Sequence, residues 1–175
     1  MPYFSISNKY REQNDDPAIQ RWMNSLPLST IRATIAGTTQ VFATTPVLTP
    51  VFTPVNLTTV TEDTASFFPV VSVASPVTGV TIPKEAGGLY IYSFYGTWTT
   101  SSPVARFQAL VHRFGTPAGS TVVDIGRSLG NQSDGLLMGF LYLNPGDTLS
   151  LQACQSSGAD STLQGVIFKF ARVTV

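Results

Sequence analysis

The chain has 175 residues, of which only 11% are charged, and its ten basic and ten acidic side chains give a formal net charge of zero. This length allows one well-buried domain with an appendage. A neutral and sparsely charged chain lacks the basic surface that nucleic acids and anionic membranes attract, so we expect neither as a partner. The single cysteine, Cys154, excludes an internal disulfide framework, and we expect it to pack as a small apolar side chain.

The N-terminal region combines a polar start with one helical signal. Residues 1–15 have neither a basic leader nor a long apolar run, which predicts a protein made in a cytosol. A helix is predicted over about 16–26, with Asp16 as N-cap and an apolar stripe formed by Ile19, Trp22, Met23 and Leu26. So short a helix is marginal alone, so the stripe must dock on its own domain, on a neighbouring subunit or on a larger assembly.

The next region is rich in threonine and proline. Twelve threonines fall between Thr30 and Thr64, and the triplet Thr-Pro-Val recurs every four residues around Pro46, Pro50 and Pro54. Prolines at this spacing exclude a helix and a central strand, so we expect an extended segment, either polyproline II or an edge strand. We therefore divide the chain into an N-terminal arm, residues 1–45, and a β-domain, residues 46–175.

After Phe67 the chain is a series of short apolar runs separated by turn signals such as Pro145-Gly146 and Ser157-Gly158. These predict strands near 67–74, 79–83, 88–98, 104–114, 120–125, 136–143, 147–154 and 163–174. About eight strands with no second helix predict a β-sandwich or jelly roll.

Three strand-like runs, 88–95, 139–151 and 163–170, are apolar on both faces. Residues 88–95 and 136–143 carry large apolar side chains at odd and even positions, whereas 106–113 and 148–153 alternate in the usual way. A strand without a polar face must be covered twice, and one small domain offers one core. We therefore predict one doubly covered sheet and one outer sheet, with another copy of the chain as the second cover.

The spacing in three of these strands resembles a known family. The patterns are Gly88-x-Tyr90-x-Tyr92-x-Phe94, Leu143-x-x-Gly146-Asp147-x-Leu149-x-Leu151 and Leu163-x-Gly165-x-x-Phe168. Together they resemble the tumour necrosis factor and C1q-like trimeric jelly rolls over roughly residues 60–175. The resemblance implies an all-β, antiparallel jelly-roll sandwich, here with a short N-terminal helix and an extended arm. It also implies an inner sheet whose strands meet around a threefold axis.

Similar trimeric jelly rolls occur in bacteriophage virions as head-decoration (cement) proteins, head fibres and receptor-binding tips. This resemblance favours a virion structural protein, specifically a homotrimeric decoration protein that binds the major capsid protein or another virion protein and stabilises the head shell. The residues that we expect to anchor it to the shell are Tyr3, Phe4, Ile19, Trp22 and Met23. For trimer contact we favour Tyr90, Tyr92, Phe94, Tyr142, Phe168 and Phe170.

Two alternatives belong to other functional classes. One is a head fibre or receptor-binding tip that recognises host surface glycans, for which Trp98 is the candidate exposed aromatic. The other is a C1q-like or tumour necrosis factor-like signalling ligand, against which the missing export signal argues.

The sequence gives little support for an enzyme. The sole histidine, His112, has no serine or cysteine nucleophile in a recognisable motif around it, and the acidic residues are spread over separate turns, where we expect them to be solvated. We predict no catalytic residues, no metal site and no cofactor. For Asp147 we predict a structural role, accepting backbone N–H bonds in the turn after Pro145.

Overall fold

The computed structural model describes residues 28–68, 71–99, 105–115, 120–127 and 134–173. Within these ranges the chain forms two antiparallel sheets and contains no helix. The predicted helix at 16–26 and the predicted anchoring residues Tyr3, Phe4, Ile19, Trp22 and Met23 lie outside the described residues.

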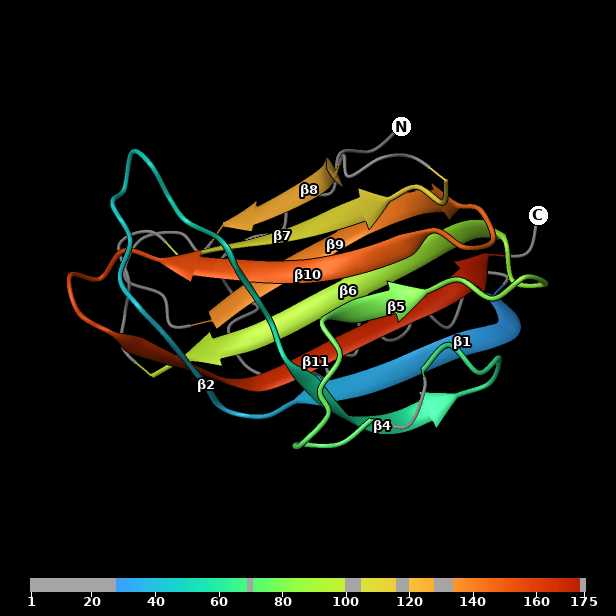
Figure 1. Ribbon diagram of the computed structural model, residues 1–175, viewed down its shortest axis with the longest axis horizontal. Coiled ribbons are helices and arrows are strands. Elements are labelled where there is room, and N and C mark those ends of the chain that lie inside the picture. The colour runs from blue at the N-terminus through green and yellow to red at the C-terminus, as the bar shows by residue number, and fades with distance from the viewer. Residues whose placement is uncertain (1–27, 69–70, 100–104, 116–119, 128–133, 174–175) are drawn as a thin grey trace.

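The two sheets pack face to face as a sandwich (Figure 1). Sheet A has the order β4-β1-β11-β6-β9, and β2 also pairs with β11. Its strands are β1 (Leu28–Gly37), β2 (Gln40–Phe42), β4 (Leu57–Asp63), β6 (Gly88–Trp98), β9 (Asp134–Leu143) and β11 (Ser161–Val173). Sheet B has the order β3-β10-β7-β8, and β5 also pairs with β10. Its strands are β3 (Thr53–Pro54), β5 (Gly79–Thr81), β7 (Ala105–His112), β8 (Ser120–Arg127) and β10 (Thr148–Gln155).

The core lies between the sheets and is rich in aromatic rings. Phe107 of β7 packs against two rings of β6, edge-on to Phe94 with centroids 4.8 Å apart and stacked on Trp98 at 6.0 Å. Phe170 of β11 meets the loop residue Phe67 at 4.6 Å. Each large side chain buried in this way contributes about 1.5–3 kcal/mol, so the aromatic layer is a main source of stability.

Most of the predicted strands after residue 78 are confirmed, but the first part of the chain is different. β1, β2 and β4 were missed, and the strand predicted at 67–74 is wrong. Asp63 explains the latter, because its carboxylate accepts N–H bonds from Ala65, Phe67 and Phe68. These bonds turn the chain away from sheet A and direct Phe67 into the core, where it is 4% exposed.

The predicted boundary between arm and domain also moves. Residues of β1 pair with both β4 and β11, and β2 pairs with β11, so the jelly roll includes the chain from Leu28 onward instead of beginning at residue 46. The Thr-Pro segment ends, as predicted, in an edge strand, since Thr53 and Pro54 pair with β10. Between β2 and β3 the chain bends at residues 47–49.

A glycine of β9 makes room for the central aromatic ring. Gly96 of β6 and Gly135 of β9 lie opposite each other, and a Cβ atom on Gly135 would overlap the ring of Phe107. We expect Gly135→Ala to lower the free energy of unfolding by about 1–3 kcal/mol through overpacking, as measured by urea denaturation. Adding Phe107→Leu should recover part of this loss. An unchanged urea midpoint in Gly135→Ala would contradict the packing described here.

Candidate subunit interface

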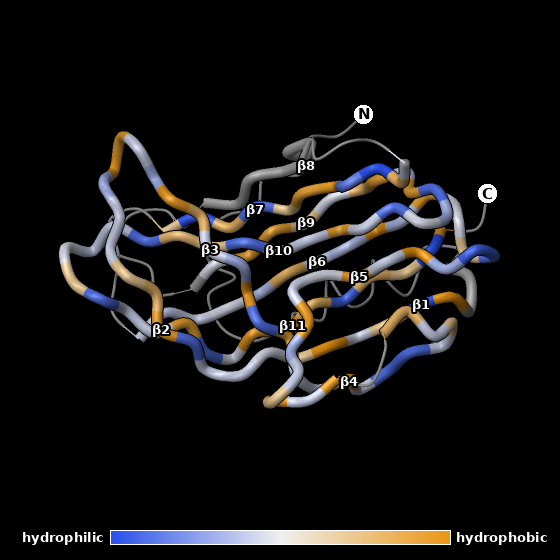
Figure 2. Tube along the Cα trace, in the orientation of Figure 1, coloured by the Kyte–Doolittle hydropathy of each residue, from blue (hydrophilic) through white to orange (hydrophobic). Residues whose placement is uncertain are grey.

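Sheet A presents an apolar outer face, directed away from the core. In β6 the side chains of Tyr90, Tyr92 and Phe94 point into the core, so those of Leu89, Ile91, Ser93 and Tyr95 point outward. In β9 the same alternation directs Leu137 and Leu143 inward and leaves four large side chains on the outside: Leu136, Met138, Phe140 and Tyr142. Figure 2 shows that apolar residues follow one another along β9.

Three of these outward side chains of β9 are open to solvent in the single chain. Leu136 is 40% exposed, Phe140 52% and Tyr142 58%. We call these three residues the β9 strip. Strand β9 ends the order of sheet A, so the strip runs along one side of the sheet, and the register brings Phe140 beside Ile91 and Tyr142 beside Leu89. An exposed apolar row of this kind marks a surface for association.

The outer face of sheet B has the opposite character. Thr148, Ser150 and Gln152 alternate along β10 with buried apolar residues. Gln152 accepts a hydrogen bond from Gln108 Nε2 at 2.7 Å, and the Thr148 hydroxyl lies 3.0 Å from that of Thr81. Polar groups that satisfy one another in this way suit contact with water. Sheet A thus has an apolar region on its outer face, whereas the outer face of sheet B carries this polar row; the second cover predicted for the first sheet stays a prediction.

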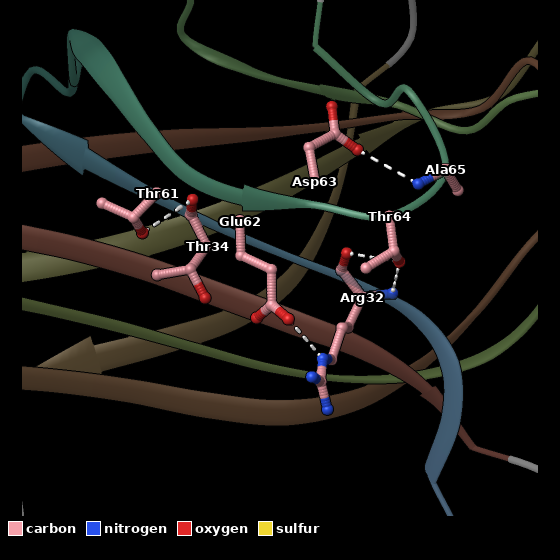
Figure 3. Close-up of polar contacts among 7 residues, drawn as sticks. All are labelled: Arg32, Thr34, Thr61, Glu62, Asp63, Thr64 and Ala65. Atoms are coloured by element: carbon pink, nitrogen blue, oxygen red, sulfur yellow. Dashed lines mark hydrogen bonds and ion pairs between the residues drawn. The ribbon is translucent and has the colours of Figure 1, made fainter.

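The far side of sheet A, along β1 and β4, is polar. Arg32 Nε lies 2.5 Å from Glu62 Oε1, and the Thr61 and Thr64 hydroxyls bond to backbone carbonyls of β1 (Figure 3). Both members of the ion pair are partly exposed, so the pair contributes at most about 1 kcal/mol. The apolar part of the face is thus restricted to β6, β9 and β11.

The structure corrects most of the residues predicted for trimer contact. Five of the six have their side chains in the core of their own domain, with exposures of 0–2%, where a second copy could not reach them: Tyr90, Tyr92, Phe94, Phe168 and Phe170. Burial raises the pKa of Tyr90 to about 12, against a smaller lowering effect of Arg172, and its hydroxyl donates to the Ala86 carbonyl. Only Tyr142 lies on the outer face.

Two other residues of the outer face differ from the β9 strip. Ile91 of β6 and Ala171 of β11 are opposite each other in the register, and the alternation directs both outward. They are nevertheless only 2% and 5% exposed, and neither belongs to the core cluster between the sheets.

The turn between β9 and β10 is held by a buried carboxylate. Asp147 accepts N–H bonds from Asn144 at 2.8 Å and from Phe114 at 3.0 Å, and it forms an ion pair with Arg113. The prediction that it accepts backbone bonds is confirmed, but the expectation of a solvated acid is wrong, because the residue is 1% exposed. Burial alone would raise the pKa of Asp147, yet the two N–H donors and Arg113 together hold that pKa below its ordinary value.

The structure also places the residues that the sequence analysis considered for other chemistry. His112 ends β7 opposite Thr148. Cys154 is buried, and this burial raises the pKa of its thiol. Trp98 lies in the core and is 1% exposed. The interpretation of Trp98 as an exposed glycan-binding aromatic is therefore wrong. Over the described residues, no group of three or more His, Cys, Asp or Glu side chains is arranged to hold a metal ion, and no helix is long and apolar enough to span a membrane.

Comparison with solved structures shows the same fold in proteins of very different sequence. The globular domain of zebrafish complement 1qA protein matches 83% of this chain and 98% of its own, with a TM-score of 0.55 and 11% identity. The PRD1 vertex protein P5 matches 86% and 99%, with a TM-score of 0.58 and 12% identity. The Eiger TNF from S. frugiperda matches 82% and 92%, with a TM-score of 0.55 and 12% identity. No family model and no curated protein sequence matches. The chain thus has a tumour necrosis factor/C1q-like jelly-roll fold, as the sequence patterns predicted.

Proposed function

We propose that the chain is a homotrimeric structural protein of a virion, in which the β9 strip of each copy packs against sheet A of the next copy around a threefold axis. The observation that carries the proposal is the exposed apolar strip itself. Each of its large side chains, once covered, stabilises the assembly by about 1.5–3 kcal/mol. Tyr142 suits the boundary of such a contact, since its ring is apolar and its hydroxyl can remain in water.

The virion assignment draws on the likeness to the PRD1 vertex protein P5, a virion protein by its name. Within this class we propose a head-decoration role, with the trimer bound to the shell through residues before Leu28, among them Tyr3 and Phe4. A protein that binds only the assembled shell stabilises it by mass action, by about 2.7 kcal/mol per site at a hundredfold excess over Kd. Three attachments on one trimer act cooperatively through effective concentration, so each can be weak.

A signalling ligand is the second candidate. It is favoured by the comparable likeness to the complement 1qA domain and to Eiger TNF, whose TM-scores are close to that of the vertex protein. Such a ligand would bind a cell-surface receptor and would show no affinity for a virion shell.

The test uses shells that lack the protein. We expect the purified full chain to bind them as trimers, visible by electron microscopy as added density at local threefold positions. Deletion of residues 1–27 should leave the oligomeric state unchanged but abolish attachment, because the attaching segment is then missing. Absence of shell binding by the full chain would overturn the decoration role, and binding to host cells alone would favour a receptor-binding protein.

A further inference from the structure

We propose that the loop between β2 and β3 inserts the apolar side chains at its tip into a bilayer of zwitterionic phospholipid. The tip consists of Val47, Leu48 and Val51, and we call it the β2–β3 tip. Insertion of one tip is a property of the single chain and does not depend on the proposed function. Only the threefold presentation of the tip, argued last, rests on that function.

The first argument is the exposure of the tip. Leu48 is 93% exposed, more than any other large apolar side chain in the described part of the chain, and Val51 and Val47 are 63% and 46% exposed. The chain bends at residues 47–49, and Figure 1 shows this segment projecting from the two sheets before the chain returns to β3. In Figure 2 the outermost part of the segment has the apolar colour. Apolar side chains gathered in this way mark a surface for association.

The second argument is that hydrogen bonds hold both ends of the loop. At its start, the Thr45 N–H donates to the Gln155 carbonyl at 2.9 Å. At its end, the Val55 N–H donates to the Leu151 carbonyl at 3.0 Å. Both anchors are backbone bonds to β10, so the loop leaves and rejoins the same strand. Ordering such a loop for a contact costs less conformational entropy than ordering a free segment.

The third argument is the chemistry of the surrounding chain, which suits an apolar environment. No Asp, Glu, Lys, Arg or His occurs from Ala33 to Thr61. Insertion of the tip therefore takes none of these charged groups out of water, and charged groups are the most costly to transfer into lipid. Pro46 and Pro50 lie beside the tip residues and carry no backbone N–H, so the tip has fewer donors that lipid would leave unsatisfied.

The size of the tip favours a bilayer over a protein partner. A stable protein interface takes about 20–30 residues from each side, together with a surface of complementary shape. The tip offers three large side chains. A bilayer needs no complementary shape, because binding to it grows with the apolar area that enters the headgroup region. Since the tip carries no cation, we expect neutral lipid to suffice and anionic lipid to add little.

The place of the tip in the fold adds a further step, within the proposed function. β1 is ten residues long, about 30 Å, and it runs from the end of the sandwich where Leu28 enters to the end where the β2–β3 loop begins. A shell that holds the trimer through residues before Leu28 therefore leaves the tips at the far end of the domain. A threefold rotation sets the three tips at equal height along its axis. They can then enter one bilayer together, so each can bind weakly.

Flotation with lipid vesicles tests the contact. We expect the purified full chain to bind vesicles of pure phosphatidylcholine, and to bind vesicles with added phosphatidylserine no more than about twofold better, with no loss between about 0.05 and 0.5 M salt. Leu48→Ser should weaken binding by at least about tenfold. Val51→Ser should weaken it as well, whereas Val73→Ser, the same change at a 71% exposed position between β4 and β5, should not. Circular dichroism monitors the fold of each variant.

Three outcomes would overturn the inference: no binding of the parent to phosphatidylcholine vesicles, equal binding by the parent and Leu48→Ser, or binding only to vesicles that contain phosphatidylserine. In the first case the tip belongs to a contact with protein. Phe140→Asp, expected to be a monomer, should bind more weakly than the trimer and should still depend on Leu48. A parent that sediments as a monomer but binds vesicles through Leu48 would refute the trimer and leave the insertion standing, so the two proposals fail separately.

A fluorescent label at the tip provides a second measurement. In a chain carrying Cys154→Ala and Leu48→Cys, a dye whose emission depends on polarity is attached to the new thiol. Its emission should move to shorter wavelength when phosphatidylcholine vesicles are added, because the label enters the apolar part of the bilayer. The same dye on Val73→Cys should show no such change. The absence of a shift at position 48, or equal shifts at both positions, would overturn the inference.

Discussion

Replacing Phe140 with aspartate is expected to convert the protein from a trimer, of three times 18.8 kDa, to a folded monomer. The side chain is 52% exposed in the single chain, so the domain tolerates the change, but the trimer would have to bury an unpaired carboxylate in an apolar contact. Burial of an unpaired charge costs several kcal/mol, more than the contact of one side chain provides. Sedimentation velocity at micromolar concentration measures the mass, and circular dichroism monitors the fold.

Val73→Asp is the matched control. Val73 is 71% exposed in the loop between β4 and β5, so the same chemical change there should leave the trimer intact. A parent protein that sediments as a monomer would contradict the proposed assembly. A Phe140→Asp protein that remains trimeric would instead show that the subunits meet on another surface.

The sequence identified the sheet whose strands are apolar on both faces, but it assigned the largest aromatics of that sheet to the wrong face. Large apolar residues at both odd and even positions of 88–95 and 136–143 show that two faces need cover, yet they do not say which face meets the domain's own core. The largest aromatics, such as Tyr92 and Phe94, were therefore assigned to the trimer, although they fill the interior of the sandwich. Aromatic rings are well suited to both places, so residue type alone does not separate them.

The glycines carried a signal that could have separated the faces. Gly135 and Gly139 lie on the same side of β9 as Leu137, and a Cβ atom on Gly139 would lie 2.7 Å from the Tyr92 hydroxyl. Glycines at alternate positions of a strand make space for rings that reach across from within the same domain. The face without them, with Leu136, Phe140 and Tyr142, was thus the outer face. Recognising this required the pairing of Tyr92 with Gly139, which is not visible in one strand alone.

The first strands were missed for a different reason. In β1 the residues Ile31, Ala33 and Ile35 alternate with Arg32 and Thr34, a weak strand pattern with few large side chains, and its position in the sheet comes from pairing with β11, more than a hundred residues later. Such long-range pairing is not visible in the local sequence. The loop after β4 was mistaken for a strand because Phe67 and Phe68 are apolar. The loop is shaped by hydrogen bonds from the backbone N–H groups of Phe67 and Phe68 to the Asp63 carboxylate, and the sequence pattern does not reveal these bonds.

Loss of the Asp147 carboxylate should be the most destabilising polar substitution in the described part of the chain. Asp147→Ala leaves two backbone N–H groups, those of Asn144 and Phe114, without their acceptor, and it removes the partner of Arg113. We expect a decrease of about 3 kcal/mol in the free energy of unfolding, at the lower end of the range for a broken buried pair because the Arg113 side chain is 40% exposed. Urea denaturation of the Phe140→Asp monomer with and without Asp147→Ala measures this change in unfolding free energy without a contribution from trimer dissociation.

The exposed pair of Arg32 and Glu62 provides the comparison. Glu62→Ala removes a partly exposed ion pair on the surface of sheet A, and we expect it to lower the free energy of unfolding by no more than about 1 kcal/mol. Equal effects of the two substitutions would contradict the role given to burial and to the N–H donors of the turn.

The pH dependence gives an independent check of the same carboxylate. The pKa of Asp147 in the folded chain lies below its ordinary value of 3.8, so the ionised form stabilises the fold. This contribution is fully present above pH 3.8 and is lost as the pH falls through the lower folded-state value. The difference in unfolding free energy between the parent and Asp147→Ala should therefore be constant near neutrality and become smaller only in acid below about pH 3.8. A difference that shrinks instead as the pH rises above neutrality would mean that another titrating group, and not the carboxylate in this turn, provides the stabilisation.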